Sequence, residues 1–289
     1  MAEIVVGVDE SECAGRALRW AVLESEVRRW PVTAVIAWGF LDQHRMIVGE
    51  RFDPSYGEAD ALAALDAAVV AAVGAETAPT VGRRAVCDLA ARALLDTAAT
   101  ADLLVVGRRG IGGFRGLLLG SVSEECVQRA PCPVAVIGPE GGEGPRGLQR
   151  IVVGIDGSET ARRALRWALE EGRVRQAAVE VVHVWHAPYV EGYGYPMAGL
   201  DPTQYEQVGR ELLKSVVEGE DTSGLPVPVK EILTDDGAAR SVLEAAKGAD
   251  LVVVGSRGMG GLKRWLLGSV SHQVIHHASC PVLVVPAAD

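Results

Sequence analysis

Aromatic residues are scarce in this sequence, and positive charge is in deficit. Aromatics make up 5% of the 289 residues, while 48% are hydrophobic, mainly alanine, valine and leucine. This composition is typical of valine-rich strands and alanine-rich helices packed in an α/β domain. The net charge of −10 argues against a nucleic-acid-binding surface as the main function. A nucleotide site is still open, because it needs only a few local cations.

Cysteine pairs, a leader pattern and long apolar runs are also missing. The five cysteines are odd in number and contain no CxxC pair, so reduced thiols are expected. The Met-Ala-Glu start lacks a basic and apolar signal region. No apolar run approaches the ~18–20 residues of a membrane span. We therefore expect a cytoplasmic protein without a membrane partner.

Short apolar strands alternate with helical patterns along the first half of the chain. Strands are expected at residues 4–8, 32–38, 81–86, 102–107 and 134–137, and helices up to about residue 28 and at 58–73, 89–100 and 121–130. This alternation predicts a parallel sheet with helices on both faces. Ligands of such sheets bind beyond the carboxyl ends of the strands, where the strand order reverses.

The second half repeats the first. IVVGVD at residues 4–9 returns as IVVGID at 151–156, and RALRWA at 16–21 returns at 163–168. Gly154 follows Gly7 by 147 positions (154 − 7), and Gly255 follows Gly107 by 148 (255 − 107). A nearly constant offset indicates two copies of one domain. We predict domains at residues 1–138 and 150–289, joined by a linker at 139–149 rich in glycine and charge.

A glycine-rich loop follows one strand of each copy. The sequences are VVGRRGIGGFRGLLLGSVS at 105–123 and VVGSRGMGGLKRWLLGSVS at 253–271, with the spacing G-x2-G-x9-G-S. This is neither a P-loop nor the dinucleotide motif. Such a loop can present backbone N–H groups and a helix N-terminus to an anion. The structural alternative is a capping box of Ser121 and Glu124, but His272 replaces Glu124 in the second copy, which favours a ligand.

The two halves resemble the universal stress protein family in its tandem form, from Ile4 to Pro286. The glycine spacing resembles that family's ATP-binding signature, and both copies add an early Gly-x-Asp-x-Ser segment and a late strand that begins with Cys-Pro-Val. The resemblance implies two Rossmann-like α/β domains, each with five parallel strands. It also implies one ATP per domain, with Mg²⁺ held through the phosphates.

The resemblance also implies which residues surround adenine, ribose and phosphates. In the first copy they are Gly7, Val8, Asp9, Ala37, Gly107, Arg108, Arg109, Gly110, Gly112, Gly113, Gly120, Ser121 and Val122. In the second they are Gly154, Ile155, Asp156, Val184, Gly255, Ser256, Arg257, Gly258, Gly260, Gly261, Gly268, Ser269 and Val270. A carboxylate at a strand end suits ribose hydroxyls. The alternative is that Asp9 and Asp156 brace a helix start beside Ser11 and Ser158.

No catalytic group or metal site stands out. His272 and His276 have i, i+4 spacing, but a third ligand is missing, so a solvated helix face is favoured. No nucleophile elbow or duplicated Ser-His-Asp order occurs. The glycine- and aromatic-rich residues 189–202 are either a lid or a long surface loop, and the loop is favoured.

We therefore expect a non-catalytic regulatory protein that binds ATP in each half and signals its bound state to an unidentified protein partner. One alternative is a slow ATP hydrolase or nucleotidyl-transferring enzyme on the same fold. Another is a dimerising scaffold without nucleotide. The last strands, Val134–Ile137 and Val282–Val285, are candidate edges for packing of the two halves. A homodimer remains open.

Overall fold

Each half of the chain forms strands and helices in alternation, as the sequence predicts. The computed structural model describes residues 2–39, 56–110, 119–139, 149–186, 201–259 and 267–287. The first half contains β1 (Ile4–Gly7), α1 (Glu12–Arg28), β2 (Val32–Trp38), α2 (Glu58–Thr77), β3 (Val81–Cys87), α3 (Ala90–Thr97), β4 (Leu103–Gly107), α4 (Ser121–Arg129) and β5 (Val134–Ile137). The second contains β6 (Arg150–Ile155), α5 (Glu159–Arg175), β7 (Ala178–Val184), α6 (Pro202–Glu218), β8 (Lys230–Thr234), α7 (Ala238–Ala245), β9 (Leu251–Gly255), α8 (Ser269–His277) and β10 (Val282–Val285).

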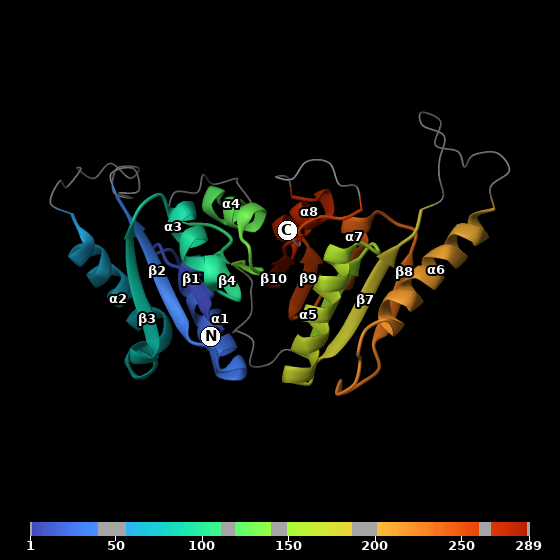
Figure 1. The fold of residues 1–289 in the computed structure, drawn as a ribbon, viewed down its shortest axis with the longest axis horizontal. Coiled ribbons are helices and arrows are strands. Elements are labelled where there is room, and N and C mark those ends of the chain that lie inside the picture. Colours follow the sequence, from blue (N-terminus) through green and yellow to red (C-terminus); the bar gives the residue numbers. More distant parts are fainter. Residues whose placement is uncertain are drawn as a thin grey trace, which may run out of the picture.

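The strands form one ten-stranded sheet with the order β3-β2-β1-β4-β5-β10-β9-β6-β7-β8. Within each half all pairings are parallel, which confirms the expected five-stranded sheets. The strands β3 and β8 lie on the outer sides and β10 lies between the halves (Figure 1). In each half the strand order reverses between the first and fourth strands, which is where a ligand is expected.

Helices cover both faces of the sheet. One buried layer holds residues of α1, α2, α5 and α6, and the other holds residues of α3, α4, α7 and α8. Successive strand residues alternate between the layers, with Ile4 and Val6 in the first and Val5 in the second. Because both faces are covered, the strands read as continuous apolar runs.

The helix α2 is more apolar than the sequence analysis expected. Together with the short 3₁₀ turn Ala78–Thr80 it is long and apolar enough, by length and composition alone, to cross a membrane. The expectation that no apolar run approaches the length of a membrane span is therefore wrong for Glu58–Thr80. Its inward side, Ala61, Leu65 and Val69, is buried in the core with α1. A non-helical Gly74, with φ 80°, interrupts the helix near its end.

Three of the five cysteine thiols are buried, and all five are free. Burial raises the pKa of Cys126 to about 12 and those of Cys132 and Cys280 to about 11. These thiols are protonated at neutral pH and serve as small apolar side chains. This agrees with the expectation of reduced cysteines.

The two halves join through their last strands, as predicted. β5 and β10 pair antiparallel, with Val134 opposite Val284, Ala135 opposite Leu283 and Val136 opposite Val282. Every residue of both strands is buried. The predicted linker 139–149 and the stretch 189–202 lie mostly outside the described residues. The domain bounds therefore stay predictions.

Four charged side chains meet between α1 and α5 at this junction. Arg28 donates to Glu24 and to Glu171, and Arg175 donates to the same two carboxylates. Both glutamate side chains are 0% exposed. Burial and the neighbouring Glu171 carboxylate raise the pKa of Glu24 to about 6, while the two arginines act in the opposite direction. We call these four residues the junction tetrad.

Two tryptophans enclose the guanidinium of Arg28. Its Cζ lies 4.8 Å from the ring centroid of Trp30 and 4.4 Å from that of Trp167. Both contacts have cation–π geometry. Since Trp30 and Trp167 come from different halves, the aromatic rings also hold the junction together.

Removal of one tetrad cation is expected to destabilise the whole molecule. The substitution Arg175→Met leaves two buried carboxylates facing one arginine, which typically costs about 3–5 kcal/mol in the free energy of unfolding. Arg129→Met is a matched control, because Arg129 pairs with Glu125 on an exposed helix face and is itself 51% exposed. We expect it to cost less than about 1 kcal/mol. Urea denaturation measures both, and equal losses would contradict the role assigned to the tetrad.

Candidate functional site

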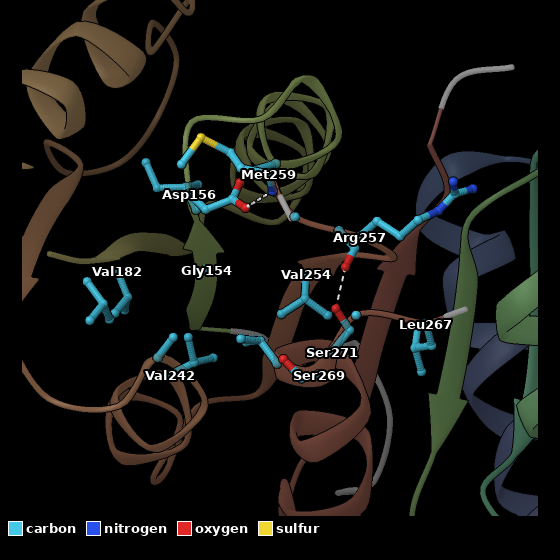
Figure 2. A pocket seen from close by; sticks show the side chains of 18 residues that line it. Gly154, Asp156, Val182, Val242, Val254, Arg257, Met259, Leu267, Ser269 and Ser271 are labelled. Carbon is cyan, nitrogen blue, oxygen red and sulfur yellow. Dashed lines mark hydrogen bonds between the residues drawn. The ribbon is translucent and has the colours of Figure 1, made fainter. Parts of the chain in front are cut away.

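A cavity of about 500 Å³ opens at the carboxyl ends of β6 and β9 (Figure 2). These are the neighbouring strands at which the order of the second half reverses. A volume of this size suits a small organic ligand or cofactor. The cavity therefore lies where the fold predicts a binding site.

The cavity has an extended apolar wall and a few polar groups. The apolar side chains that line it are Ile155, Ala161, Val182, Val184, Ala238, Val242, Val254, Met259, Leu267 and Val270. The polar side chains are Asp156, Arg257, Ser269 and Ser271. In Figure 2, Val182 and Val242 lie on one side of the cavity, while Arg257 and Leu267 lie on the other. The site thus combines an apolar end with a more polar one.

Most of the residues predicted for the second copy line this cavity. They are Gly154, Ile155, Asp156, Val184, Gly255, Arg257, Gly258, Gly268, Ser269 and Val270. Gly260 and Gly261 lie outside the described residues. Ser256 is buried behind the cavity, where its hydroxyl accepts a hydrogen bond of 3.2 Å from the backbone N–H of Ala287. The structure thus brings together residues that lie about 100 positions apart in the sequence.

The residues predicted for the first copy occupy the same points of the repeat. Gly7 ends β1, Gly107 ends β4, and Gly120 precedes α4. Ala37 stands near the end of β2, as Val184 does in β7. The other described residues are Val8, Asp9, Arg108, Arg109, Gly110, Ser121 and Val122, whereas Gly112 and Gly113 lie outside the described residues.

The carboxylate of Asp156 ties the helix start to the glycine loop. Its Oδ1 accepts from the N–H of Ser158 at 3.0 Å. Its Oδ2 accepts from the N–H of Met259 at 2.7 Å (Figure 2). Ser158 in turn caps α5 by accepting from Ala161 N–H. The helix-start contact weighed in the sequence analysis is therefore present, and a contact to the loop accompanies it.

A side chain at Gly258 has no room beside this carboxylate. A Cβ atom there would lie 2.2 Å from Oδ2 of Asp156, and one at Gly110 would lie 2.2 Å from Oδ2 of Asp9. In the first half, Asp9 also accepts from the N–H of Ser11, at 3.2 Å. The second glycine of G-x2-G-x9-G-S is thus required for close approach of the loop to the aspartate.

The helices α4 and α8 begin with uncapped amides. Gly120 and Gly268 are the N-cap residues, and neither helix has a side-chain cap. The capping box of Ser121 and Glu124, which was the structural alternative to a ligand, is therefore absent. Glu124 instead donates its N–H to the Gly120 carbonyl and accepts from the Gln128 amide.

The serines at the first helical position are exposed, so their hydroxyls are available to a ligand. Ser121 and Ser269 both stand where the first-turn N–H groups and the helix dipole favour negative charge. An anion such as a phosphate is the ligand that this arrangement suits best.

A second serine of each loop was missed by the sequence analysis. Ser123 donates its hydroxyl to the Gly107 carbonyl at 2.6 Å, and Ser271 donates to the Gly255 carbonyl. Both serines are buried, and each fixes its helix start to the end of β4 or β9. The duplicated sequence GSVS could have indicated this role, because its second serine is present in both copies.

The predicted solvated face of α8 holds for His272 and His277, whereas His276 is half-buried and its Nε2 is enclosed. His272 and His277 are exposed, and the rings of His272 and His276 lie 4.2 Å apart. Burial, together with the neighbouring His272 and His277, lowers the pKa of His276. Within the described ranges no cluster of three metal-ligating side chains occurs.

The comparison with known families agrees with the repeat and the fold. The model of the universal stress protein family matches residues 1–138 and 147–286, which is nearly the whole chain. The chain belongs to the universal stress protein family. It is a tandem member, since the family model matches it twice.

Known members of the family are similar over the full length. A universal stress protein of Mycobacterium tuberculosis is 32% identical over 292 residues, covering 97% of this chain and 95% of the relative. One from Mycolicibacterium smegmatis is also 32% identical and covers 98% and 96%. A third, again from M. tuberculosis, is 38% identical over 185 residues, but the match spans 64% of this chain and 61% of that relative.

A solved structure supports the architecture. The crystal structure of a universal stress protein from Archaeoglobus fulgidus has a TM-score of 0.67 and covers 99% of this chain and 98% of its own. Its sequence identity is 20%, so the likeness concerns the fold alone. Two Rossmann-like halves with helices on both faces are common to the two proteins.

The contact between Asp156 and Gly258 gives a prediction on stability. Gly258→Ala forces the carboxylate away from its amide partners, and we expect a loss of about 1–2 kcal/mol in the free energy of unfolding. In an Asp156→Ala background the clash is gone, so the same Gly258→Ala change should be neutral or stabilising by up to about 1 kcal/mol. Thermal or urea denaturation of the four proteins tests this cycle. Additive losses would mean that the two residues do not interact.

Proposed function

We propose that this protein is an ATP-binding regulatory protein with one nucleotide site in each half. The observation that carries the proposal is the cavity of the second half, which joins the carboxylate of Asp156 to the first turn of α8. The resemblance to the ATP-binding members of the family implies the same ligand. Since the loops are duplicated, the proposal extends to both halves.

The cavity suits the three parts of a nucleotide. The valines Val182, Val184 and Val242 offer an apolar wall for a flat base. Asp156 can accept from ribose hydroxyls, because each carboxylate oxygen has more than one lone pair. The amides and hydroxyl at Ser269 suit the phosphates. Mg²⁺ would be held through those phosphates, since no carboxylate cluster is found among the described residues.

The two sites differ in their apolar walls. Ala37 stands where the second half has Val184, and Leu94 of α3 stands where it has Val242 of α7. A Cβ on Gly7 would lie 2.8 Å from Leu94, and one on Gly154 would lie 2.9 Å from Val242. Compared with the second half, the apolar wall of the first half is thus smaller at Ala37 and larger at Leu94. We infer that the two sites bind the base with different affinities.

Loss of the second site alone should halve the stoichiometry of ATP binding. The substitution Ser269→Glu places a carboxylate where the phosphates are proposed to bind, and like-charge repulsion should exclude them. Isothermal titration with Mg²⁺ and ATP should give two sites per chain for the nucleotide-free protein and one for this variant. Ser279→Glu, an exposed serine just after the other end of α8, is the matched control and should retain two. Absence of binding to the unmodified protein would contradict the proposed function.

A binding role without catalysis is the best account of the site chemistry. Among the described residues that line the cavity, Asp156 and Arg257 are the only titratable side chains. Asp156 already accepts from two backbone amides, so its role is structural as well as binding. Hydrolysis needs a group that positions or activates water near the γ-phosphate, and the described cavity offers no dedicated one.

Single-turnover hydrolysis separates the binding protein from the slow ATP hydrolase. With protein in excess over labelled ATP and Mg²⁺, we expect product to form at the rate of the protein-free solution. The variant Asp156→Asn, which keeps the shape of the side chain, should give the same rate. A rate above background that this variant abolishes would favour the enzyme.

The remaining parts of the proposal concern partners. The two halves associate within one chain through β5 and β10, so a homodimer would need a further surface. A scaffold without nucleotide leaves the duplicated glycine loops unexplained. We propose that the nucleotide-bound state is recognised by a regulatory protein in the cytoplasm.

A further inference from the structure

Arg108 connects the glycine loop of the first half to the second half. Its side chain is 9% exposed, and its Nη1 donates to the carbonyl of Ala278 at 3.1 Å. A Cβ on Gly138 would lie 3.3 Å from Cζ of Arg108, so the guanidinium packs against the backbone just after β5. The side chain that the sequence analysis assigned to the ligand thus reaches into the other half.

The backbone of Arg108 belongs to the proposed phosphate site of the first half. Its N–H donates to Ile137 at 2.8 Å, and its carbonyl accepts from the N–H of Gly120 at 2.8 Å. Gly120 is the N-cap of α4, immediately before Ser121. A phosphate held at Gly107, Gly110 and Ser121 would therefore contact the segments that fix the position of Arg108.

Ala278 belongs to the helix that forms the proposed phosphate site of the second half. It is the C-cap of α8, and its N–H donates to Val274 at 2.9 Å. At the other end of this nine-residue helix, Gly268, Ser269 and Val270 line the cavity. A helix of this length spans roughly 13 Å, so α8 connects the proposed phosphate site to the contact with Arg108. A cation at its C-terminal carbonyls also complements the helix dipole.

Only the first half sends a side chain from this loop position into the other half. Ser256 occupies the position of Arg108 in the second half and makes the same backbone contacts, with Val285 at 2.7 Å and Gly268 at 2.8 Å. Its hydroxyl, however, accepts from Ala287, within its own half. A serine cannot reach across the junction, so the link depends on one arginine.

We propose that Arg108 is a positioning residue that couples the two nucleotide sites by joining the first glycine loop to the C-terminal end of α8. The inference rests on the proposed function. A ligand in the first half fixes Arg108, which holds α8 in the position that the second ligand requires. Linkage makes the effect reciprocal, so each ligand strengthens the binding of the other.

A thermodynamic cycle tests the coupling with Mg²⁺ and ATP. Ser121→Glu blocks the first site, so titration of that variant gives the affinity of the second site alone. We expect this affinity to be about fivefold weaker than that of the second site in the unblocked protein, at the lower end of typical couplings. In an Arg108→Met background the ratio should fall to about one. Arg129→Met, which removes an exposed arginine that pairs with Glu125 on α4, is the control and should leave the fivefold ratio unchanged.

The variants also separate the possible failures. A ratio that Arg108→Met leaves unchanged, or a ratio of one in the unmodified protein, would overturn the coupling while the proposed function stands. If neither the unmodified protein nor any of the variants bound ATP, both the proposed function and the coupling would be wrong. Circular dichroism establishes that each variant is folded, and if Arg108→Met is not, Arg108→Gln serves in its place. Arg108→Lys, which keeps the charge but not the planar fork, should retain part of the coupling.

Discussion

The antiparallel pairing of β5 with β10 is the contact on which the rest of the structure depends. It joins two parallel sheets into one and brings α1 against α5 on one face. The pairing involves three residue pairs, so backbone hydrogen bonds alone fix it weakly. The junction tetrad adds a charge network with one favourable arrangement, since each arginine contacts a glutamate from both halves. Buried charges of this kind give little net stability but penalise any arrangement that separates them. We infer that they select this packing of the two halves.

The duplicated halves share their backbone contacts and differ in their side chains. In both, an aspartate accepts from a helix-start amide, and a buried serine donates to the carbonyl of the glycine that ends β4 or β9. In both, the residue after that glycine accepts from the N-cap of the next helix. The divergence falls on Ala37 and Val184 at the apolar wall, and on Arg108 and Ser256 behind the loop. The backbone contacts of the loops are therefore retained, while the side chains at the apolar wall and at the junction of the halves differ.

Local patterns in the sequence were sufficient for the fold, and long-range contacts were not. The strand Val32–Trp38 has the predicted bounds, because apolar alternation and turns are local properties. The S-x-x-E spacing made a cap at Ser121 an alternative because it is a local pattern, but Gly120 takes that position in the structure. Glu24 and Arg28 have the i, i+4 spacing of an ordinary surface pair, and only the approach of α5 buries them. Arg108 was interpreted as a loop cation for the same reason, since its partner lies 170 residues away.

The contact between Asp156 and Met259 bears on the proposed role of the site, which is binding without catalysis. Because Oδ1 and Oδ2 each accept one backbone N–H, the carboxylate and the loop are already positioned before a ligand binds. Each oxygen retains a further lone pair, so a hydroxyl can bind without breaking these contacts. Preorganisation of this kind lowers the entropic cost of binding. The same two amides restrict Asp156 as a general base, because each occupies a lone pair of one carboxylate oxygen and together they hold the side chain in place. The two contacts that position Asp156 for a ligand hydroxyl therefore also limit its use as a general base.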